Sequence, residues 1–402
     1  MSAPLPQTRP WSPSTWASVA SLAFGSLALV SSELLPMGLL TPLARDIGVS
    51  EGAAGQAVTL TAIFAGLAAP TIALVIGRID RKLVMLALCL LVIASNVAAA
   101  FAWTYWALLG ARVLLGIASG GFFALAGATV ARLVSMEGFG RGMSIVFLGV
   151  SAATVAAPPL GALITEAYGW RAAFLAAAGF GLVALALQAL CLPRVPASGA
   201  TSLAALFGLT ARTDVRIGLA AALLIVGGHF AGFTFIRPYL ETCTRLGAGA
   251  IAAVLFAYGL ASLVGNAVAG PLADRSLRSG FALTGLVLGA AALGLAALGG
   301  SLAPALVFSA LWGLGFGAAP VMIQTWMGRS APDQLEGVGG LFLAALQFAI
   351  ALGAVGGGVA VDRYGPTVPL GITAACSLMA AALIAGRRSP GAMRDDALAE
   401  AR

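Results

Sequence analysis

Residues 249–270 read GAIAAVLFAYGLASLVGNAVAG, residues 271–280 read PLADRSLRSG, and residues 281–299 read FALTGLVLGAAALGLAALG. Two apolar runs of about 20 residues, the length that crosses a bilayer as a helix, are separated by one short charged loop. Backbone groups find no hydrogen-bond partners in hydrocarbon, and the runs lack the alternation of barrel strands, so they must be helical. The stretch predicts two consecutive membrane-spanning helices.

The same pattern covers all 402 residues of the chain. Hydrophobic side chains make up 60% of it and charged ones 9%, whereas soluble domains carry about 25% charged residues. Twelve apolar runs leave too little sequence for a large enzyme domain outside the membrane. We therefore predict an all-α membrane protein with twelve transmembrane helices. The predicted spans are residues 16–41, 53–76, 83–102, 105–131, 142–165, 171–192, 217–240, 249–270, 281–299, 303–327, 338–360 and 367–386.

The longest polar interruption, residues 193–216, follows the sixth span. It predicts an N-terminal six-helix bundle at 1–192, a linker at 193–216, and a C-terminal six-helix bundle at 217–402 that ends in a short tail. A cytoplasmic N-terminus puts sixteen Lys and Arg residues on the cytoplasmic side and four on the other. Both termini and the linker are therefore predicted to be cytoplasmic. The scattered cations form no basic patch, so we expect no nucleic-acid partner.

Three motifs recur in the second half at a nearly constant offset of 194 to 197 residues. They are Asp80-Arg81 with Asp274-Arg275, Tyr168-Gly169 with Tyr364-Gly365, and Gly116 and Gly120 with Gly313 and Gly317. One match could be chance, but three in register indicate that a six-helix unit is repeated.

The stretch from Gly270 to Arg278, GPLADRSLR, resembles the cytoplasmic loop motif of the major facilitator superfamily, and the copy around Asp80 is degraded. The resemblance covers nearly the whole chain and implies two pseudo-symmetric six-helix bundles that expose a central site to each side in turn. It also implies a gate that latches the cytoplasmic side closed. The implied gate residues are Asp80, Arg81, Gly270, Asp274, Arg275 and Arg278.

Two further stretches narrow the resemblance. Residues 32–42, SELLPMGLLTP, and residues 235–238, FIRP, resemble the arabinose and purine-ribonucleoside efflux permeases of the drug/proton antiporter branch. The branch's fifth-span signature has Ala here at three of its Gly positions. This resemblance implies an exporter in the bacterial inner membrane, driven by inward proton movement.

Ionisable groups inside spans are candidate functional residues, because a charge at the bilayer centre costs about 2.5–3.5 kcal/mol. Four qualify: Glu33, Arg112, His229 and Arg237. Glu33 lies about 25 Å into its span and is predicted to exchange a proton; the alternatives are a helix-end acid wetted by the outer surface and an acid tied to a neighbouring helix. The resemblance implies that Arg112 faces the cavity and helps hold that proton; the alternative is an arginine bonded to backbone carbonyls.

His229 and Arg237 are predicted to line a substrate cavity; alternatively, His229 is a structural hydrogen bonder and Arg237 reaches the membrane surface. A single histidine and four widely spaced cysteines predict no metal site. Among polar neutral residues in spans, Asn266 and Gln347 are the preferred substrate contacts, because an amide donates and accepts hydrogen bonds. Hydrogen bonding between helices is the competing role for both.

The predicted function is proton-coupled export of a small polar solute, such as a purine nucleoside, by a protein that works as a monomer. Export of sugars or drugs by the same mechanism is the alternative. A membrane-embedded enzyme or sensor would need a paired catalytic constellation or a soluble domain, and the sequence offers neither. Glycine-rich stretches such as Gly120-Gly121 lack the Lys-Ser/Thr of phosphate loops, so we expect no nucleotide or other cofactor.

Overall fold

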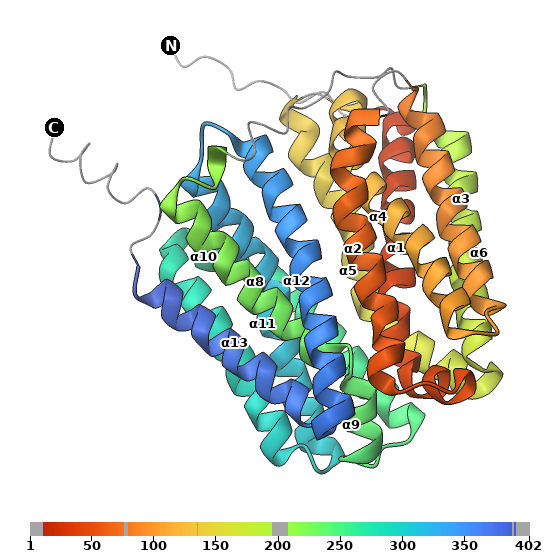
Figure 1. Cartoon of the computed structure of the whole chain (residues 1–402). Coiled ribbons are helices and arrows are strands. Elements are labelled where there is room, and N and C mark those ends of the chain that lie inside the picture. The colour runs from red at the N-terminus through yellow and green to blue at the C-terminus, as the bar shows by residue number, and fades with distance from the viewer. Residues whose placement is uncertain (1–10, 76–78, 135, 195–207, 388–389, 391–402) are drawn as a thin grey trace, which may run out of the picture.

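The computed structural model describes residues 11–75, 79–134, 136–194, 208–387 and 390, and every regular element in these ranges is an α-helix. Figure 1 shows α1 to α6 packed together on one side and α8 to α13 on the other. The helices are α1 (Pro13–Ile47), α2 (Glu51–Val75), α3 (Arg81–Ala100), α4 (Tyr105–Leu133), α5 (Met136–Tyr168), α6 (Trp170–Cys191), α8 (Thr213–Phe233), α9 (Ile236–Thr242), α10 (Ala248–Leu298), α11 (Leu302–Ser330), α12 (Leu335–Tyr364) and α13 (Val368–Ala385).

Local sequence sets where the first helix begins and ends. The Ser12 hydroxyl accepts a hydrogen bond from the Thr15 amide at 3.2 Å, and Pro13 occupies the first helical position, where its missing N–H costs nothing. The helix ends at Gly48, whose φ of 76° is left-handed and favours glycine. The observed helix is longer than the predicted span 16–41 at both ends.

Eleven of the described helices are long and apolar enough to cross a membrane. One of them, α10, has 51 residues, about 77 Å at 1.5 Å per residue, which is enough for two crossings. Its backbone leaves the helical region at Ser276, where φ is −163° and ψ is 99°. The predicted spans 249–270 and 281–299 are therefore the two parts of α10, and the twelve predicted crossings are confirmed.

The seventh predicted span, 217–240, is interrupted in the structure. Helix α8 ends at Phe233, and the short helix α9 starts at Ile236. Pro238 explains the break, because proline has no N–H to donate and its ring clashes with the carbonyl one turn earlier, that of Thr234. The break gives Arg237 a direction that a continuous helix would not.

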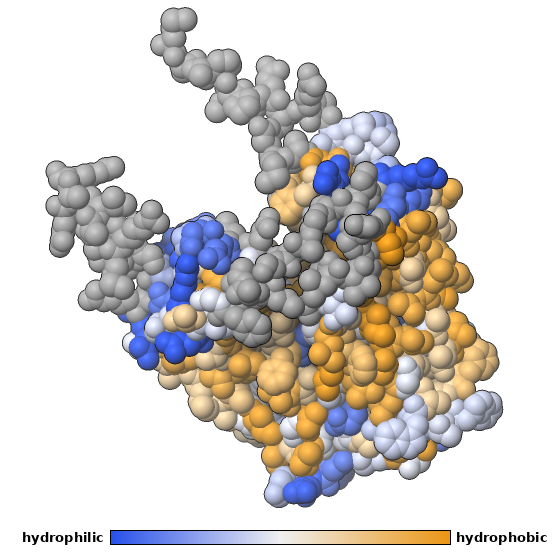
Figure 2. All heavy atoms as spheres, turned by 45° about the horizontal axis from the view of Figure 1, so that its top comes forward, coloured by the Kyte–Doolittle hydropathy of each residue, from blue (hydrophilic) through white to orange (hydrophobic). Residues whose placement is uncertain are grey.

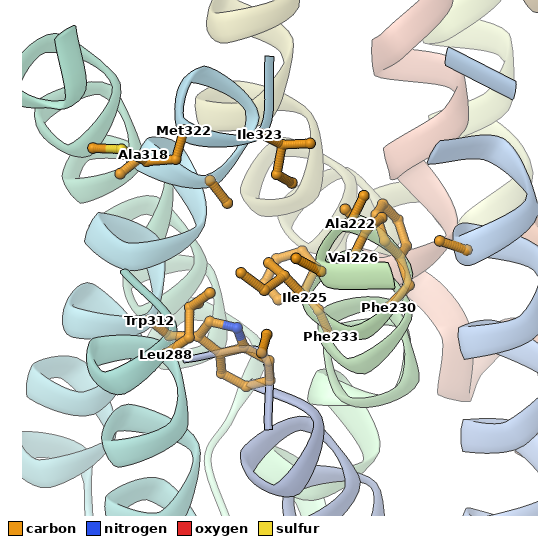
Figure 3. Close-up of a cluster of buried hydrophobic side chains, with 14 of the residues drawn as sticks. Ala222, Ile225, Val226, Phe230, Phe233, Leu288, Trp312, Ala318, Met322 and Ile323 are labelled. Atoms are coloured by element: carbon orange, nitrogen blue, oxygen red, sulfur yellow. The ribbon is translucent and has the colours of Figure 1, made fainter. Parts of the chain in front are cut away.

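On the face that Figure 2 shows, hydrophobic residues cover the middle of the molecule, and hydrophilic residues gather toward its two ends. We call the end where α1 begins and α13 ends the terminal end, and the opposite one the distal end. The two halves contact each other through α2 with α12, α5 with α10, and α1 with α9. The largest core cluster lies in the second half around Trp312, Ile225 and Met322 (Figure 3).

The repeat predicted from the sequence is visible in the packing. A Cβ atom on Gly116 or Gly120 would meet the α2 backbone at Thr61 or Ala65. A Cβ atom on Gly313 or Gly317 would meet the first part of α10 at Tyr258 or Ser262, which lie 197 residues after Thr61 and Ala65. Gly169 and Gly365, 196 residues apart, both have positive φ, of 83° and 87°. The two halves therefore share one helix-packing scheme.

The predicted boundaries 1–192, 193–216 and 217–402 stay predictions, since residues 195–207 lie outside the described ranges. From residue 208 the chain already packs on the second half: Leu209 is buried in its core. Arg212 donates two hydrogen bonds of 2.6 Å to Asp333, and these bonds lower the pKa of that carboxyl to about 2. Helix α8 accordingly begins at Thr213, four residues before the predicted span.

Candidate functional site

A pocket lies between the two halves near the middle of the spans. Helices α1 and α2 of the first half and α8 and α12 of the second line it. The lining residues are Glu33, Leu34, Met37, Val58, Thr61, Ala62, Phe230, Gln347 and Ile350. Two of the predicted site residues, Glu33 and Gln347, thus share one cavity although they are 314 positions apart.

A second pocket lies along α2 and α12 toward the terminal end. It is lined by Ala65, Gly66, Ala69, Gly120, Phe123, Leu343, Ala344 and Gln347. Gln347 belongs to both cavities and, among the described residues that line the second one, is the only one with a polar side chain.

Glu33 projects from α1 into the first cavity. Its Oε1 atom is buried and has no hydrogen-bond partner among the described residues. The Ser119 side chain is a polar neighbour of Glu33, and Arg112 is the nearby positive charge. Sequence reasoning missed Ser119, although the spacing from Arg112 of seven residues, two helical turns, places both on one face of α4.

Arg112 is fully buried in α4 beside Glu33. Its Nη2 donates to the Ser32 carbonyl at 2.8 Å, and its guanidinium carbon lies 5.9 Å from the centre of the Phe174 ring. Within the described ranges, its Nε and Nη1 atoms are buried without a hydrogen-bond partner. Both the backbone contact and an unused hydrogen-bonding capacity toward the Glu33 side are therefore present. Asn96 supports this region by donating to the Ser32 hydroxyl at 2.7 Å.

His229 lies in the core of the second half and does not line either cavity. The Trp312 Nε1–H donates to His229 Nδ1 at 3.0 Å, and Tyr258 Oη lies 3.5 Å from Nε2. An accepting Nδ1 fixes the neutral tautomer with its proton on Nε2. Phe316 stacks on the ring with centroids 3.4 Å apart. The structure thus places His229 in an aromatic core, whereas its neighbour Phe230 leaves α8 on the side away from Trp312 (Figure 3) and lines the cavity.

Arg237 and Asn266 also lie outside the two cavities. Arg237 is buried in α9, where its Nε donates to Glu241 Oε1 at 2.7 Å and its Nη1 donates to the Gly38 carbonyl of α1. Arg237 therefore joins the halves near the distal end. Asn266 is exposed on α10. The sequence places both residues in spans but does not say which way they face.

Three hydrogen bonds join the two halves at the distal end. Asp362 of α12 accepts from the Ser50 hydroxyl at 2.6 Å and from the Gly52 amide at 2.9 Å, so it caps the start of α2 from the other half. The bond from Arg237 to Gly38 is the third. These contacts close the molecule at the distal end.

The predicted gate residues lie at the terminal end. Asp80 accepts from the Lys82 amide at 2.8 Å and caps α3, and Arg81 is buried. In the second half, Asp274 lies 3.9 Å from Arg329 of the same half. Gly270 is half-buried, and Arg275 and Arg278 are exposed. Whether these groups latch the two halves together stays a prediction.

We find no candidate metal site among the described residues. In the ranges that the structure describes, no three His, Cys, Asp or Glu side chains lie close enough to hold a metal ion. The four cysteines are free thiols.

Comparison with known proteins identifies the family of this chain. The family model of the Major Facilitator Superfamily matches residues 20–243 and 219–401. The chain is 35% identical to the purine ribonucleoside efflux pump NepI of Salmonella paratyphi B. The alignment of 372 residues covers 92% of this chain and 94% of the relative. The NepI pump of Salmonella typhimurium matches with the same identity and coverage.

Two solved structures share the fold. A bacterial homolog of the human lysosomal transporter Spinster, in an inward-facing and unoccupied conformation, superposes with a TM-score of 0.73 at 14% identity, covering 95% of this chain and 100% of that one. The human organic anion transporter MFSD10 gives a TM-score of 0.67 at 20% identity, covering 93% and 100%. Relatives and structural neighbours alike are transporters rather than enzymes.

Proposed function

Because this chain belongs to the major facilitator superfamily, we propose that it is a secondary active transporter that exports purine ribonucleosides. The observation that carries the proposal is the 35% identity to a purine ribonucleoside efflux pump over 92% of the chain. The cavity between the halves supports it, because it offers a carboxyl and an amide among apolar side chains.

We place the protein in the bacterial inner membrane with its terminal end in the cytoplasm. This orientation is supported by the distribution of Lys and Arg, of which sixteen then lie on the cytoplasmic side and four on the outer side. The hydrogen bonds at the distal end then close the outer side, so that solute reaches the cavity from the cytoplasm. In this proposal the protein works as a monomer in the lipid bilayer.

Export is coupled in this proposal to protons that move inward through Glu33. The supporting observations are its unpaired Oε1 atom in the cavity and the neighbouring Arg112, two of whose donors are also unpaired in the described structure. When Glu33 binds a proton, Arg112 loses a counter-charge; when Glu33 releases it, the pair is restored. One proton that moves down about 100 mV supplies roughly 2.3 kcal/mol, enough for about a fiftyfold solute gradient.

The proposed substrate contacts are Glu33, Phe230 and Gln347, which share the cavity. His229 acts behind Phe230 by fixing the aromatic core, and Arg237 by joining α9 to α1, so both support the cavity rather than line it. Asn266 lines neither cavity, so it can contact the solute directly only outside them.

The test is uptake into proteoliposomes in which the terminal end of the protein faces the external buffer. With the lumen acidified, labelled inosine should accumulate, because protons leaving the lumen drive solute toward the distal side. Glu33→Gln should abolish this accumulation yet retain exchange of inosine between the two sides. The matched control is Glu166→Gln, which removes an exposed carboxyl on α5 far from the cavity.

Accumulation of labelled arabinose instead of inosine would assign the protein to sugar export. Full accumulation by Glu33→Gln would refute the coupling role and leave the substrate class standing.

A further inference from the structure

Gln347 occupies the point where the two cavities meet. It projects from α12 of the second half toward α2 of the first. A Cβ atom built on Gly66 of α2 would lie 3.5 Å from the Cβ atom of Gln347. The amide makes no hydrogen bond to any residue that the structure describes. Both its donor and its acceptor are therefore available to a solute.

The surroundings of Gln347 differ on its two sides. Toward α1 lies the Glu33 carboxyl, with Ser119 and Arg112 behind it. Elsewhere around it lie apolar and aromatic groups, among them Phe230 of the second half and, toward the terminal end, Phe123 of the first.

Thr61 also lines the first cavity, but its hydroxyl contributes little to binding a solute. Its hydroxyl already contacts the Ala57 carbonyl at 2.9 Å and the Arg112 carbonyl at 3.3 Å. The free polar groups of the cavity are therefore a carboxyl on one half and an amide on the other, set against an apolar wall.

A nucleoside has the matching division. Its ribose carries hydroxyls that can donate hydrogen bonds to a carboxyl group. Its base is flat, with apolar faces and polar groups only at its edge. The ribose therefore suits the Glu33 side, and the base suits the space beside Phe230, with its edge toward Gln347.

We propose that Gln347 reads the pairing edge of the purine base through two hydrogen bonds, and thereby sets which bases the carrier accepts. This inference rests on the proposed export of purine ribonucleosides. The side-chain amide can rotate by half a turn, which exchanges its donor and its acceptor. One orientation pairs with the N1–H and O6 of inosine, and the other pairs with the N1 and amino group of adenosine. The carrier therefore accepts 6-oxo and 6-amino purines alike.

Two nearly isosteric variants test this role. Gln347→Met keeps the shape and flexibility of the side chain but removes both hydrogen bonds. Gln347→Glu keeps only acceptors, which suits guanosine, because its N1–H and amino group both donate. The matched control is Gln324→Met, which changes an exposed glutamine on α11 that lines neither cavity.

The measurement is competition by unlabelled nucleosides against labelled inosine in proteoliposomes. In the native protein, inosine and adenosine should compete about equally, and both better than purine riboside, which lacks the group at position 6. Gln347→Met should remove the advantage of inosine over purine riboside, a loss of roughly fivefold to a hundredfold for a bidentate pair. Gln347→Glu should raise the preference for guanosine over adenosine by a similar factor, and Gln324→Met should change neither ratio.

Unchanged ratios in both Gln347 variants, with transport retained, would overturn the base-reading role but leave nucleoside export intact. A native protein that transports no purine nucleoside would overturn the proposed function itself. Equal losses for inosine and purine riboside would also overturn the inference, because a structural role for Gln347 lowers transport without changing selectivity.

Discussion

Replacement of Asp362 by Ala should shift the protein toward a state that is open at the distal end. The Asp362 carboxylate joins α12 to the start of α2 through the Ser50 hydroxyl and the Gly52 amide. Rotation of one half away from the other at this end must break both hydrogen bonds. Loss of the carboxylate therefore destabilises the distally closed state and leaves the distally open state unaffected.

The size of the effect follows from the two bonds. A side-chain cap on a helix N-terminus contributes about 1 kcal/mol. The second bond, from a hydroxyl, adds about 0.5–1 kcal/mol, and the exposure of Ser50 and Asp362 keeps it at the low end. The total of about 1.5 kcal/mol changes the ratio of the two states by roughly tenfold.

Distances between spin labels at the terminal end measure this ratio. Cysteines introduced at the exposed positions Arg132 of α4 and Arg387 after α13, in a background without the four native cysteines, report on the two halves. Asp362→Ala should enlarge the population with the shorter distance. Asp46→Ala is the control: its carboxylate binds Trp170 and Arg171 within one half, so its loss leaves the ratio unchanged. An unchanged ratio in Asp362→Ala would show that other contacts hold the distal end closed.

Three further changes test the packing and the charges. Trp312→Phe should lower stability by about 1–3 kcal/mol in thermal unfolding in detergent, because it leaves the buried Nδ1 of His229 without its donor. Gly317→Val should cost about 1–3 kcal/mol by forcing α11 off α10, whereas Gly110→Ala, with no atom within 4 Å of the added carbon, should cost almost nothing. Asp333 has its pKa lowered to about 2, so its pairing with Arg212 is complete above about pH 4 and is lost only as the pH falls through about 2. Asp333→Asn should therefore leave the pH dependence of transport between about pH 5 and 8 unchanged, as initial rates in proteoliposomes would show.

The fold could be predicted from the sequence because the bilayer leaves few choices. An apolar run of sufficient length must be a helix, and the spacing of Asp80 and Asp274, or of Gly169 and Gly365, reveals the repeat. The helical continuity of α10 across residues 271–275 could not be predicted, because polar residues suit a helix that emerges into water as well as they suit a loop. The break before α9 could have been inferred from Pro238.

The site could be predicted only in part. Hydropathy gives the depth of a residue in the membrane but not its direction around the helix, since both the lipid-facing and the protein-facing sides of a span are apolar. Glu33 and Gln347 were therefore predicted as residues, but their meeting in one cavity was not. For the same reason the exposure of Asn266 and the inward burial of His229 could not be read from their spans.

The repeat also shows how the two halves divide the work. An offset of 197 residues pairs Glu33 with Phe230, and Arg112 with Ser309. The first half therefore supplies the Glu33 carboxyl of the cavity, with Arg112 beside it, and the second half supplies the Phe230 ring and the Gln347 amide. In the proposed mechanism, a solute that touches both halves favours the arrangement in which Glu33 and Gln347 are close, whereas a proton on Glu33 acts on one half alone. Solute and proton thus differ in which states they stabilise, and only such a difference lets one drive the other.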